Sequence, residues 1–433
     1  MILVMVFTFI ASQPCESRIM FVLPTLDQDT WTRYNNEVSA LLGPLHLEVS
    51  TGEISPAQAA ELFSSRLGEF LSSKQEFVKD QKENSSYTKH ESTALKKARA
   101  AKNALRKKAF GKNSTKEDMQ QFRQAVKTHN FLKKLDETKH KQKTSRHHES
   151  LYRKNFYKFA KNCTNGTLDQ TPQGPTFSET EANTYYPTKY SQPNPVDLAA
   201  LTWFPYLPIP ASNPFNLEPI RPKHIKAILH SKKPTSAPGP DGIMYGILRK
   251  LPATHHVLAT VFTKMLMEGD PPESWSKSTV TLIHKAGDTS DPQNFRMISL
   301  TSCVGKVFHQ TMSDRISEYL LSNNYIDSST QKAFLKGING CIEHTFVMNE
   351  LLANARNKKK TIHVTFFDLA DAFGSVEHNL IFHTLQRNGL SKTVFSYVEN
   401  LYSRLQGQVK GPSWTLQFQK GSFRVIHCLQ PFF

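Results

Sequence analysis

The positive charge of this chain is concentrated in one stretch, and that stretch offers little apolar surface for a core. Residues 96–161 hold 21 Lys and Arg against 5 Asp and Glu, a net +16 of the +17 carried by all 433 residues. The remainder is nearly neutral, and a chain of this length with 38% hydrophobic residues can build a core. The sequence therefore predicts a strongly basic part beside one or two globular parts.

The basic stretch has the composition of helices. The run "ALKKARAAKNALRKKAF" consists mostly of strong helix formers. Apolar residues recur along the stretch at helical spacing: Phe122, Val126, Leu132, Leu135, Leu151, Phe156 and Phe159. We interpret it as two or three basic helices with a thin apolar face, suited to lie along a nucleic-acid backbone. A solvated helical face or a localisation signal is the alternative.

Composition changes mark three regions. Residues 163–222 are rich in Pro, Thr, Asn and Tyr, which is typical of a linker, and "WFPYLPIPASNPF" within them reads as an extended arm packed on the next domain. We therefore predict a basic, mainly helical region at 1–162, a linker and arm at 163–222, and a chemistry-bearing domain at 223–433.

The cysteines and the N-terminus bear on localisation. No CxxC pair occurs among the five cysteines, so neither a zinc site nor a disulfide framework is predicted, and a reducing compartment is favoured. The apolar start "MILVMVFTFIASQPCES" resembles a secretory signal, but no Lys or Arg precedes it. We prefer to interpret this apolar segment as a core strand, or as the product of an accidental upstream start of translation. We expect no membrane partner, and a nuclear or cytoplasmic location rather than secretion.

The domain at 223–433 begins with a helix, the compact loop "SAPGPDG" and a second helix. Residues 278–284 then read as a strand, 286–291 as a turn, 297–300 as a second strand, and Gly305 starts an amphipathic helix. Lys285 and Arg296 therefore lie on the two arms of one hairpin, close enough to face a common anion such as a triphosphate. Two solvated charges at a hairpin tip are the alternative.

A second motif is "VTFFDLADAFGSVEH", an apolar strand over 361–367 that ends on Asp368 and turns into a helix. A strand terminus holds a carboxylate rigidly, and Mg²⁺ is a hard ion that prefers such oxygen ligands. The alternative is that Asp368 caps the following helix.

Taken in order, "SAPGPDGI", "LIHKAGD", "NFRMISLTS", "GKVFHQTMSDRI", "QKAFLKGINGC" and "FFDLADAFGSVEHNLI" resemble the reverse transcriptase of non-LTR (LINE-like) retrotransposons over residues 201–418. The resemblance implies an α/β (α+β) fold, the fingers and partial palm of a right-hand polymerase, preceded here by the basic helical region. It also implies an RNA template, a DNA primer and deoxynucleoside triphosphates as partners, and Mg²⁺ as the cofactor.

The resemblance assigns roles to single residues. Asp368 is the catalytic, metal-binding carboxylate, and Lys285 and Arg296 bind the incoming triphosphate. Phe373 stands at the sugar-gate position, where a ring excludes the ribose 2′-hydroxyl, with plain core packing as the alternative. Gln331 and Phe334, in "QKAF", match a stretch near template and primer. The loop "SAPGPDG" is also expected beside the template.

The sequence departs from the family in several places. Met297 replaces a frequent Pro, Ala333 a Gly and Gly374 an Asp, and none of these changes by itself abolishes the chemistry. More important, no aspartate follows Asp371, so the family's second motif, an Asp-Asp pair, is missing. Two closely spaced divalent ions need several anionic ligands. We therefore expect a polymerase fragment truncated within the palm and inactive, with residues 361–367 left as an unpaired sheet edge.

The final residues suggest why the Asp-Asp motif is missing. Back-translated with suitable codons, "SFRVIHCLQPFF" reads F-Q-G-D-P-L-S-P-A-I-F in another frame, which matches a family motif that follows the strand in "WTLQFQKG". The hypothesis is that one base was lost after the codon for Gly421. The alternative function, from a different class, is a non-catalytic nucleic-acid-binding protein that uses the basic helices.

Overall fold

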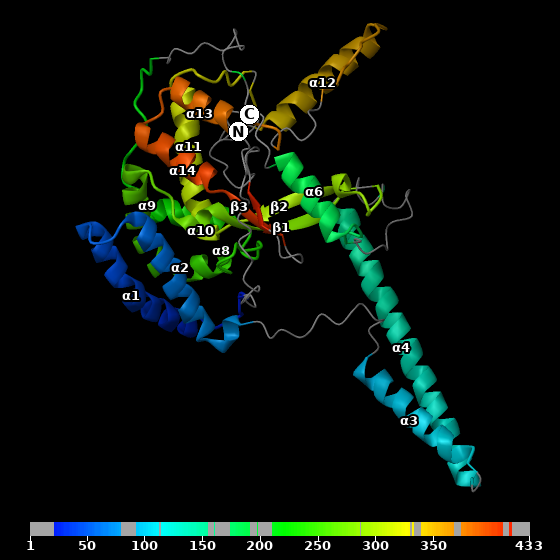
Figure 1. Cartoon of the computed structure of the whole chain (residues 1–433). Helices are drawn as coiled ribbons and strands as arrows, with labels where there is room; N and C mark the ends of the chain where they lie inside the picture. The colour runs from blue at the N-terminus through cyan, green and yellow to red at the C-terminus, as the bar shows by residue number, and fades with distance from the viewer. Residues whose placement is uncertain are drawn as a thin grey trace, which may run out of the picture. The chain divides into compact units, whose positions relative to one another are not determined.

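The chain forms two compact units, Gln81–Pro172 and the remainder, Met1–Asp80 with Gln173–Phe433 (Figure 1). The computed structural model describes residues 21–78, 92–111, 114–154, 160, 174–190, 197, 210–285, 287–329, 331–332, 339–367, 374–409 and 415–417. The apolar N-terminal run and the final residues lie outside this described part. The exact boundaries of the three regions predicted from composition therefore stay a prediction.

The smaller unit is a pair of basic helices, α3 (Thr93–Ala109) and α4 (Lys116–Lys154), which pack against each other. The Phe110 ring meets the Phe122 ring edge-on at a centroid distance of 5.6 Å. The Ser92 amide donates to Asp136 Oδ2 at 2.9 Å and joins the start of α3 to the middle of α4. The predicted basic helices are confirmed for these residues, and Phe122 of the expected apolar face contacts α3, whereas Leu135 of that face is 39% exposed.

In the larger unit, two N-terminal helices flank α9 (Ala253–Glu268). They are α1 (Gln28–Thr51), which ends at Gly52 with φ 82°, and α2 (Pro56–Ser72), which starts with a reciprocal Ser55–Gln58 cap. Their buried residues recur at helical spacing: Val38, Leu42, Leu45, Val49, Phe63, Leu67 and Leu71. Composition alone had grouped these helices with the basic region, whereas their contacts are with α9.

Aromatic rings fill the centre of this unit. Phe262 of α9 lies 5.3 Å from Phe308 of α11 (Cys303–Ser322), and Phe308 lies 5.1 Å from Tyr397 of α14 (Lys392–Ser403). Trp275 of α10 (Glu273–Ser276) lies 5.8 Å from Phe308. Further helices of this unit are α7 (Pro222–Ser231), α8 (Tyr245–Lys250), α12 (Gly340–Asn357) and α13 (His378–Arg387). The helices expected before and after "SAPGPDG", and the one expected from Gly305, are confirmed as α7, α8 and α11.

One small mixed sheet completes the helix-rich fold, with strand order β2-β1-β3-β4. β1 (Lys277–His284) pairs antiparallel with β2 (Phe295–Leu300) and parallel with β3 (Gln406–Val409). β4 (Thr415–Gln417) closes the other edge beside β3. The predicted hairpin strands are confirmed within two residues.

The strand predicted over 361–367 is wrong for this structure. These residues form no regular element, and Phe366 and Phe367 are 84% and 94% exposed. An apolar run becomes a strand only where a neighbouring strand accepts its backbone hydrogen bonds, and no described strand pairs with this segment. The expected unpaired sheet edge is therefore an exposed irregular segment.

Part of the predicted linker is helical. α6 (Glu179–Tyr190) lies inside 163–222 and starts at a reciprocal cap, in which the Ser178 amide donates to Glu181 and the Glu181 amide donates to Ser178 Oγ. The arm prediction holds for its described end, because Phe215 packs on Tyr319 at 5.8 Å. No helix in the described part of the chain has the length and apolarity to cross a membrane.

Candidate functional site

The β1–β2 hairpin carries Lys285 at the end of one arm and Arg296 on the other. Cross-strand partners at its end are Ile283 with Arg296 and His284 with Phe295. The Lys285 amide continues the ladder by donating to Asn294 O at 2.7 Å. Side chains of successive strand residues alternate between faces, so Ile283, Lys285 and Arg296 share one face of the hairpin.

The connection between the arms is held by its own hydrogen bonds. Gly287 adopts φ 92°, which favours glycine, and the side-chain Nδ2 of Asn294 donates to Asp288 O at 2.9 Å across the turn. Asp288 Oδ1 accepts from the Ser290 amide at 3.0 Å, which lowers the pKa of that carboxyl. Asp291 Oδ1 accepts from the Gln293 amide at 2.9 Å. These bonds fix the separation of the two arms.

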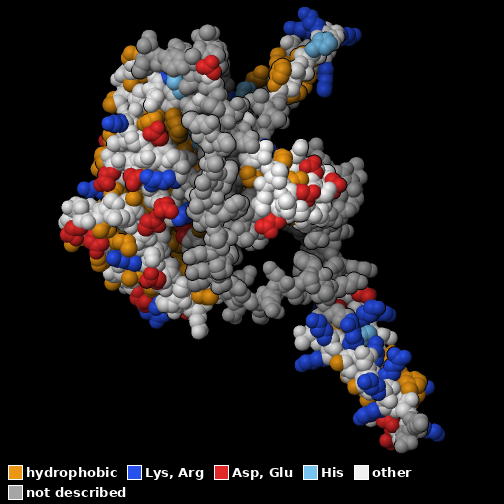
Figure 2. All heavy atoms as spheres, viewed as in Figure 1, with side chains coloured by type: hydrophobic (Ala, Val, Ile, Leu, Met, Phe, Trp, Pro, Cys, Tyr) orange, Lys and Arg blue, Asp and Glu red, His pale blue; other side chains and the backbone are white. Residues whose placement is uncertain are grey.

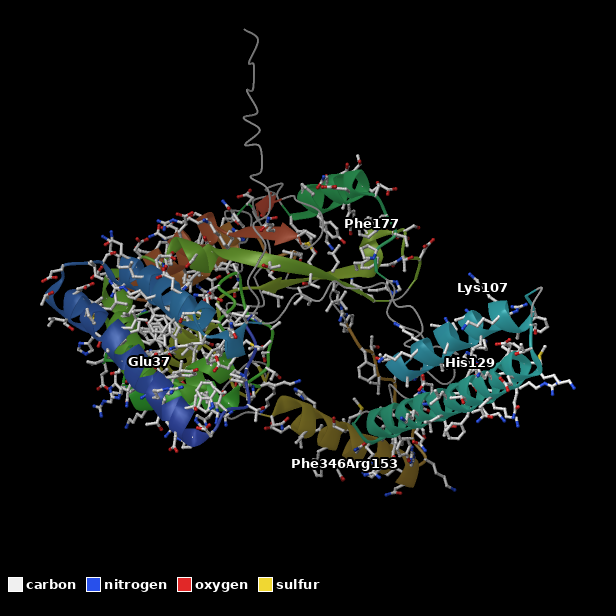
Figure 3. All side chains as sticks on the ribbon, turned by 90° about the horizontal axis from the view of Figure 1, so that it is seen from below. Glu37, Lys107, His129, Arg153, Phe177 and Phe346 are labelled. Atoms are coloured by element: carbon white, nitrogen blue, oxygen red, sulfur yellow. The ribbon has the colours of Figure 1, made fainter. Side chains whose placement is uncertain are left out.

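One face of the hairpin is covered. Phe295 packs against His284 at 5.1 Å and, edge-on, against Phe177 at 5.3 Å. The Tyr186 hydroxyl of α6 donates to Pro292 O at 3.2 Å, and burial raises the pKa of this phenol. Figure 3 labels Phe177 beside the hairpin. This support was not predicted from the sequence because the Ser178-x-x-Glu181 cap, a helix-start signal, stands in a proline-rich stretch.

The opposite face is open and cationic. Lys285 and Arg296 are exposed, and Ile283 between them is 51% exposed. Lys285 Nζ donates to Gln293 O at 3.2 Å, which holds the ammonium at the end of the hairpin. A guanidinium and an ammonium on one solvent-facing surface can attract a phosphate-bearing anion. The sequence prediction that both cations share one hairpin is confirmed.

The loop "SAPGPDG", residues 236–242, packs against the start of α11. Ser302 caps that helix by accepting from the Val304 and Gly305 amides, and its hydroxyl donates to Asp241 Oδ2. Gly239 lies so close to Thr301 and Ser302 that a Cβ would strike their backbone atoms. The loop is thereby fixed to the carboxyl end of β2, the strand that carries Arg296.

Of the other predicted site residues, only Gln331 lies among those that the structure describes. Asp368, Phe373 and Phe334 lie outside the described residues. Gln331 is half-buried, and its amide donates to Asp327 O at 2.9 Å. Within the described part, no three His, Cys, Asp or Glu side chains group in a way that would hold a metal ion.

Comparison with known proteins places this site in a family. Residues 283–425 match the family model described as reverse transcriptase (RNA-dependent DNA polymerase). The Pol polyprotein of the type-1 retrotransposable element R2 from Popillia japonica is 28% identical over 181 residues, 42% of this chain and 24% of that protein. The corresponding R2 protein of Nasonia vitripennis is 29% identical over 184 residues, 42% of this chain and 17% of that protein.

A third relative is the RNA-directed DNA polymerase from the mobile element jockey of Drosophila melanogaster, 27% identical over 188 residues, 42% of this chain and 20% of that protein. Residues 283–425 are thus a reverse transcriptase region. Its relatives are the polymerases of non-LTR retrotransposons, which confirms the resemblance seen in the motifs. The chain spans a quarter or less of the length of these three relatives.

Proposed function

We propose that this chain carries the fingers and the first part of the palm of an RNA-directed DNA polymerase. In the complete protein, this enzyme would add deoxynucleotides to a DNA primer on an RNA template. The observation that carries the proposal is the open hairpin face with Lys285 and Arg296, because it lies in the region related to reverse transcriptases. Lys285 would supply a point charge to the triphosphate, and Arg296 would grip it through two parallel hydrogen bonds.

The remaining roles rest on the motifs. Asp368 would hold the catalytic metal, and Phe373 would exclude the ribose 2′-hydroxyl. Gln331 and Phe334 would lie near template and primer. A carboxylate suits Mg²⁺, which when bound would activate the primer hydroxyl and stabilise the leaving pyrophosphate. One carboxylate motif does not offset the charge of two such ions, so we propose that these 433 residues alone do not catalyse the reaction.

Triphosphate binding tests the hairpin directly. Photolabelling of the 433-residue polypeptide by an azido-deoxyadenosine triphosphate with Mg²⁺ should fall about tenfold or more in Lys285→Gln or Arg296→Gln, because each removes a charge-assisted hydrogen bond. The quantity to measure is labelled protein against nucleotide concentration.

Lys277→Gln is the matched control. Lys277 is at the other end of β1 and forms an ion pair with Glu273 at 2.7 Å, so its loss should leave labelling unchanged. Equal loss of labelling in all three variants, or in none, would contradict the assignment of the hairpin as the triphosphate site.

A second function, nucleic-acid binding by the basic helices, is favoured by a separate observation. The Lys and Arg side chains of α3 and α4 are mostly exposed, and Figure 2 shows them gathered over these helices. Two of the few carboxylates are bonded to groups that are not cations, Asp118 to Thr115 and Asp136 to Ser92. Glu149 forms an ion pair with Arg153. The exposed lysines and arginines outnumber these carboxylates and can contact phosphates.

Salt dependence tests this second function. The affinity of the full chain for RNA should fall as the salt concentration rises. A triple variant with Arg106→Gln, Lys107→Gln and Lys108→Gln should reduce the slope of log K against log salt by up to about 2, because each lost phosphate contact contributes about 0.7. The control replaces Lys358, Lys359 and Lys360, three exposed lysines at the end of α12, in the same way. An equal change in slope for the control would contradict a site on the basic helices.

A further inference from the structure

One aromatic ring of the basic helices takes no part in the packing between them. Phe131 of α4 is 66% exposed. Phe122, on the same helix, contacts Phe110 at the end of α3. Nine residues separate Phe122 from Phe131, which is about two and a half helical turns. Phe131 therefore lies on the side of α4 that is turned away from α3.

Cations flank this ring. Lys127 precedes Phe131 by four positions and Lys134 follows it by three, so the three side chains share one face of the helix. Both lysines are exposed, and the neighbouring Leu135 is 39% exposed. We define Lys127, Phe131, Lys134 and Leu135 as the outer face of α4.

The charge of the outer face selects the kind of ligand. Asp136 accepts from the Ser92 amide on the α3 side of the helix. Asp118 is bound by the Thr115 amide and hydroxyl at the start of α4. Glu137 is exposed three positions after Lys134, so the two lysines of the outer face stand near one exposed carboxylate and keep a net positive charge. This charge suits a polyanion that also offers apolar surface.

We propose that the outer face of α4 binds a single-stranded polynucleotide, with one base stacked on Phe131 and adjacent phosphates held by Lys127 and Lys134. Every base has a π-face that covers an aromatic ring, whereas in a duplex the base faces are already stacked on each other. Cations alone would serve a duplex equally well. The exposed ring between them is what favours a single strand. This inference rests on nucleic-acid binding as proposed above and adds the strand class and the stacking residue.

The test compares the full chain and its variants by fluorescence anisotropy with labelled oligouridine, oligodeoxythymidine and a duplex of equal length. Phe131→Ala should weaken binding of both single strands about tenfold, leave the duplex unchanged, and leave the salt slope unchanged because no phosphate contact is lost. Phe131→Trp should retain the affinity. Lys127→Gln with Lys134→Gln should instead lower the single-strand salt slope by about 1.4, at about 0.7 per phosphate.

Phe346→Ala is the matched control, since Phe346 of α12 is 63% exposed and belongs to the larger unit. Single-strand binding by Phe131→Ala equal to that of the unaltered chain would overturn the stacking proposal alone. The same holds if duplex and single strands weaken together, or if Phe346→Ala has an equal effect. If the unaltered chain binds none of the three probes, nucleic-acid binding by the basic helices fails, and the stacking proposal fails with it.

Discussion

Replacing Gly239 by alanine should lower the free energy of unfolding of the larger unit by about 3 kcal/mol. The added Cβ would meet the Ser302 amide nitrogen and the Thr301 carbonyl carbon closer than van der Waals contact allows, and would lie 2.5 Å from Thr301 O. These are backbone atoms between β2 and α11, so no side-chain rotation relieves the clash. Urea denaturation followed by tryptophan fluorescence measures the change.

Gly68→Ala provides the control. Gly68 lies in α2, and no atom stands within 4 Å of the Cβ it would gain. Alanine is a better helix former than glycine, so this variant should gain about 0.5–1 kcal/mol. A Gly239→Ala protein as stable as the unaltered chain would show that the loop does not pack tightly on α11, and would remove the support we assign to the carboxyl end of β2.

Local signals predicted the hairpin well. The apolar runs of β1 and β2 are bounded by Gly287, Asp291 and Pro292, which favour a turn, and strands of this kind pair with their neighbour in sequence. The presence of Lys285 and Arg296 on the two arms of this hairpin followed from the same signals. What the sequence did not reveal is the bonding between Asn294 and Asp288 that fixes the turn.

Long-range contacts were not predictable from one sequence. Nothing in the sequence of α1 or α2 indicates that their apolar faces pack on α9, which starts more than 180 positions later in the chain. The same limit explains the error over 361–367, because the apolar pattern is that of a strand and only a pairing partner makes it one. α6 was overlooked because Pro187 and the surrounding composition outweighed the signal of its cap.

Asp368 is central to the proposal that a carboxylate of this chain holds the catalytic metal. One base can be restored in the coding DNA after the codon for Gly421, so that translation continues in the alternative frame. The resulting polypeptide should contain the Asp-Asp pair and extend a primer. In that polypeptide, Asp368→Asn should reduce incorporation by at least about a thousandfold, since a bound metal contributes several kcal/mol to the transition state. Chelation of Mg²⁺ should have the same effect as the substitution.

The decisive measurement is template-primed incorporation of deoxynucleotides with Mg²⁺ by the 433-residue polypeptide and by its frame-restored counterpart, assayed together. We expect no incorporation by the first, and by the second incorporation that depends on Asp368 and on the RNA template. Primer extension by the 433-residue polypeptide itself, or a restored frame that yields neither an Asp-Asp pair nor activity, would contradict the proposal that Asp368 acts with carboxylates that these residues do not include.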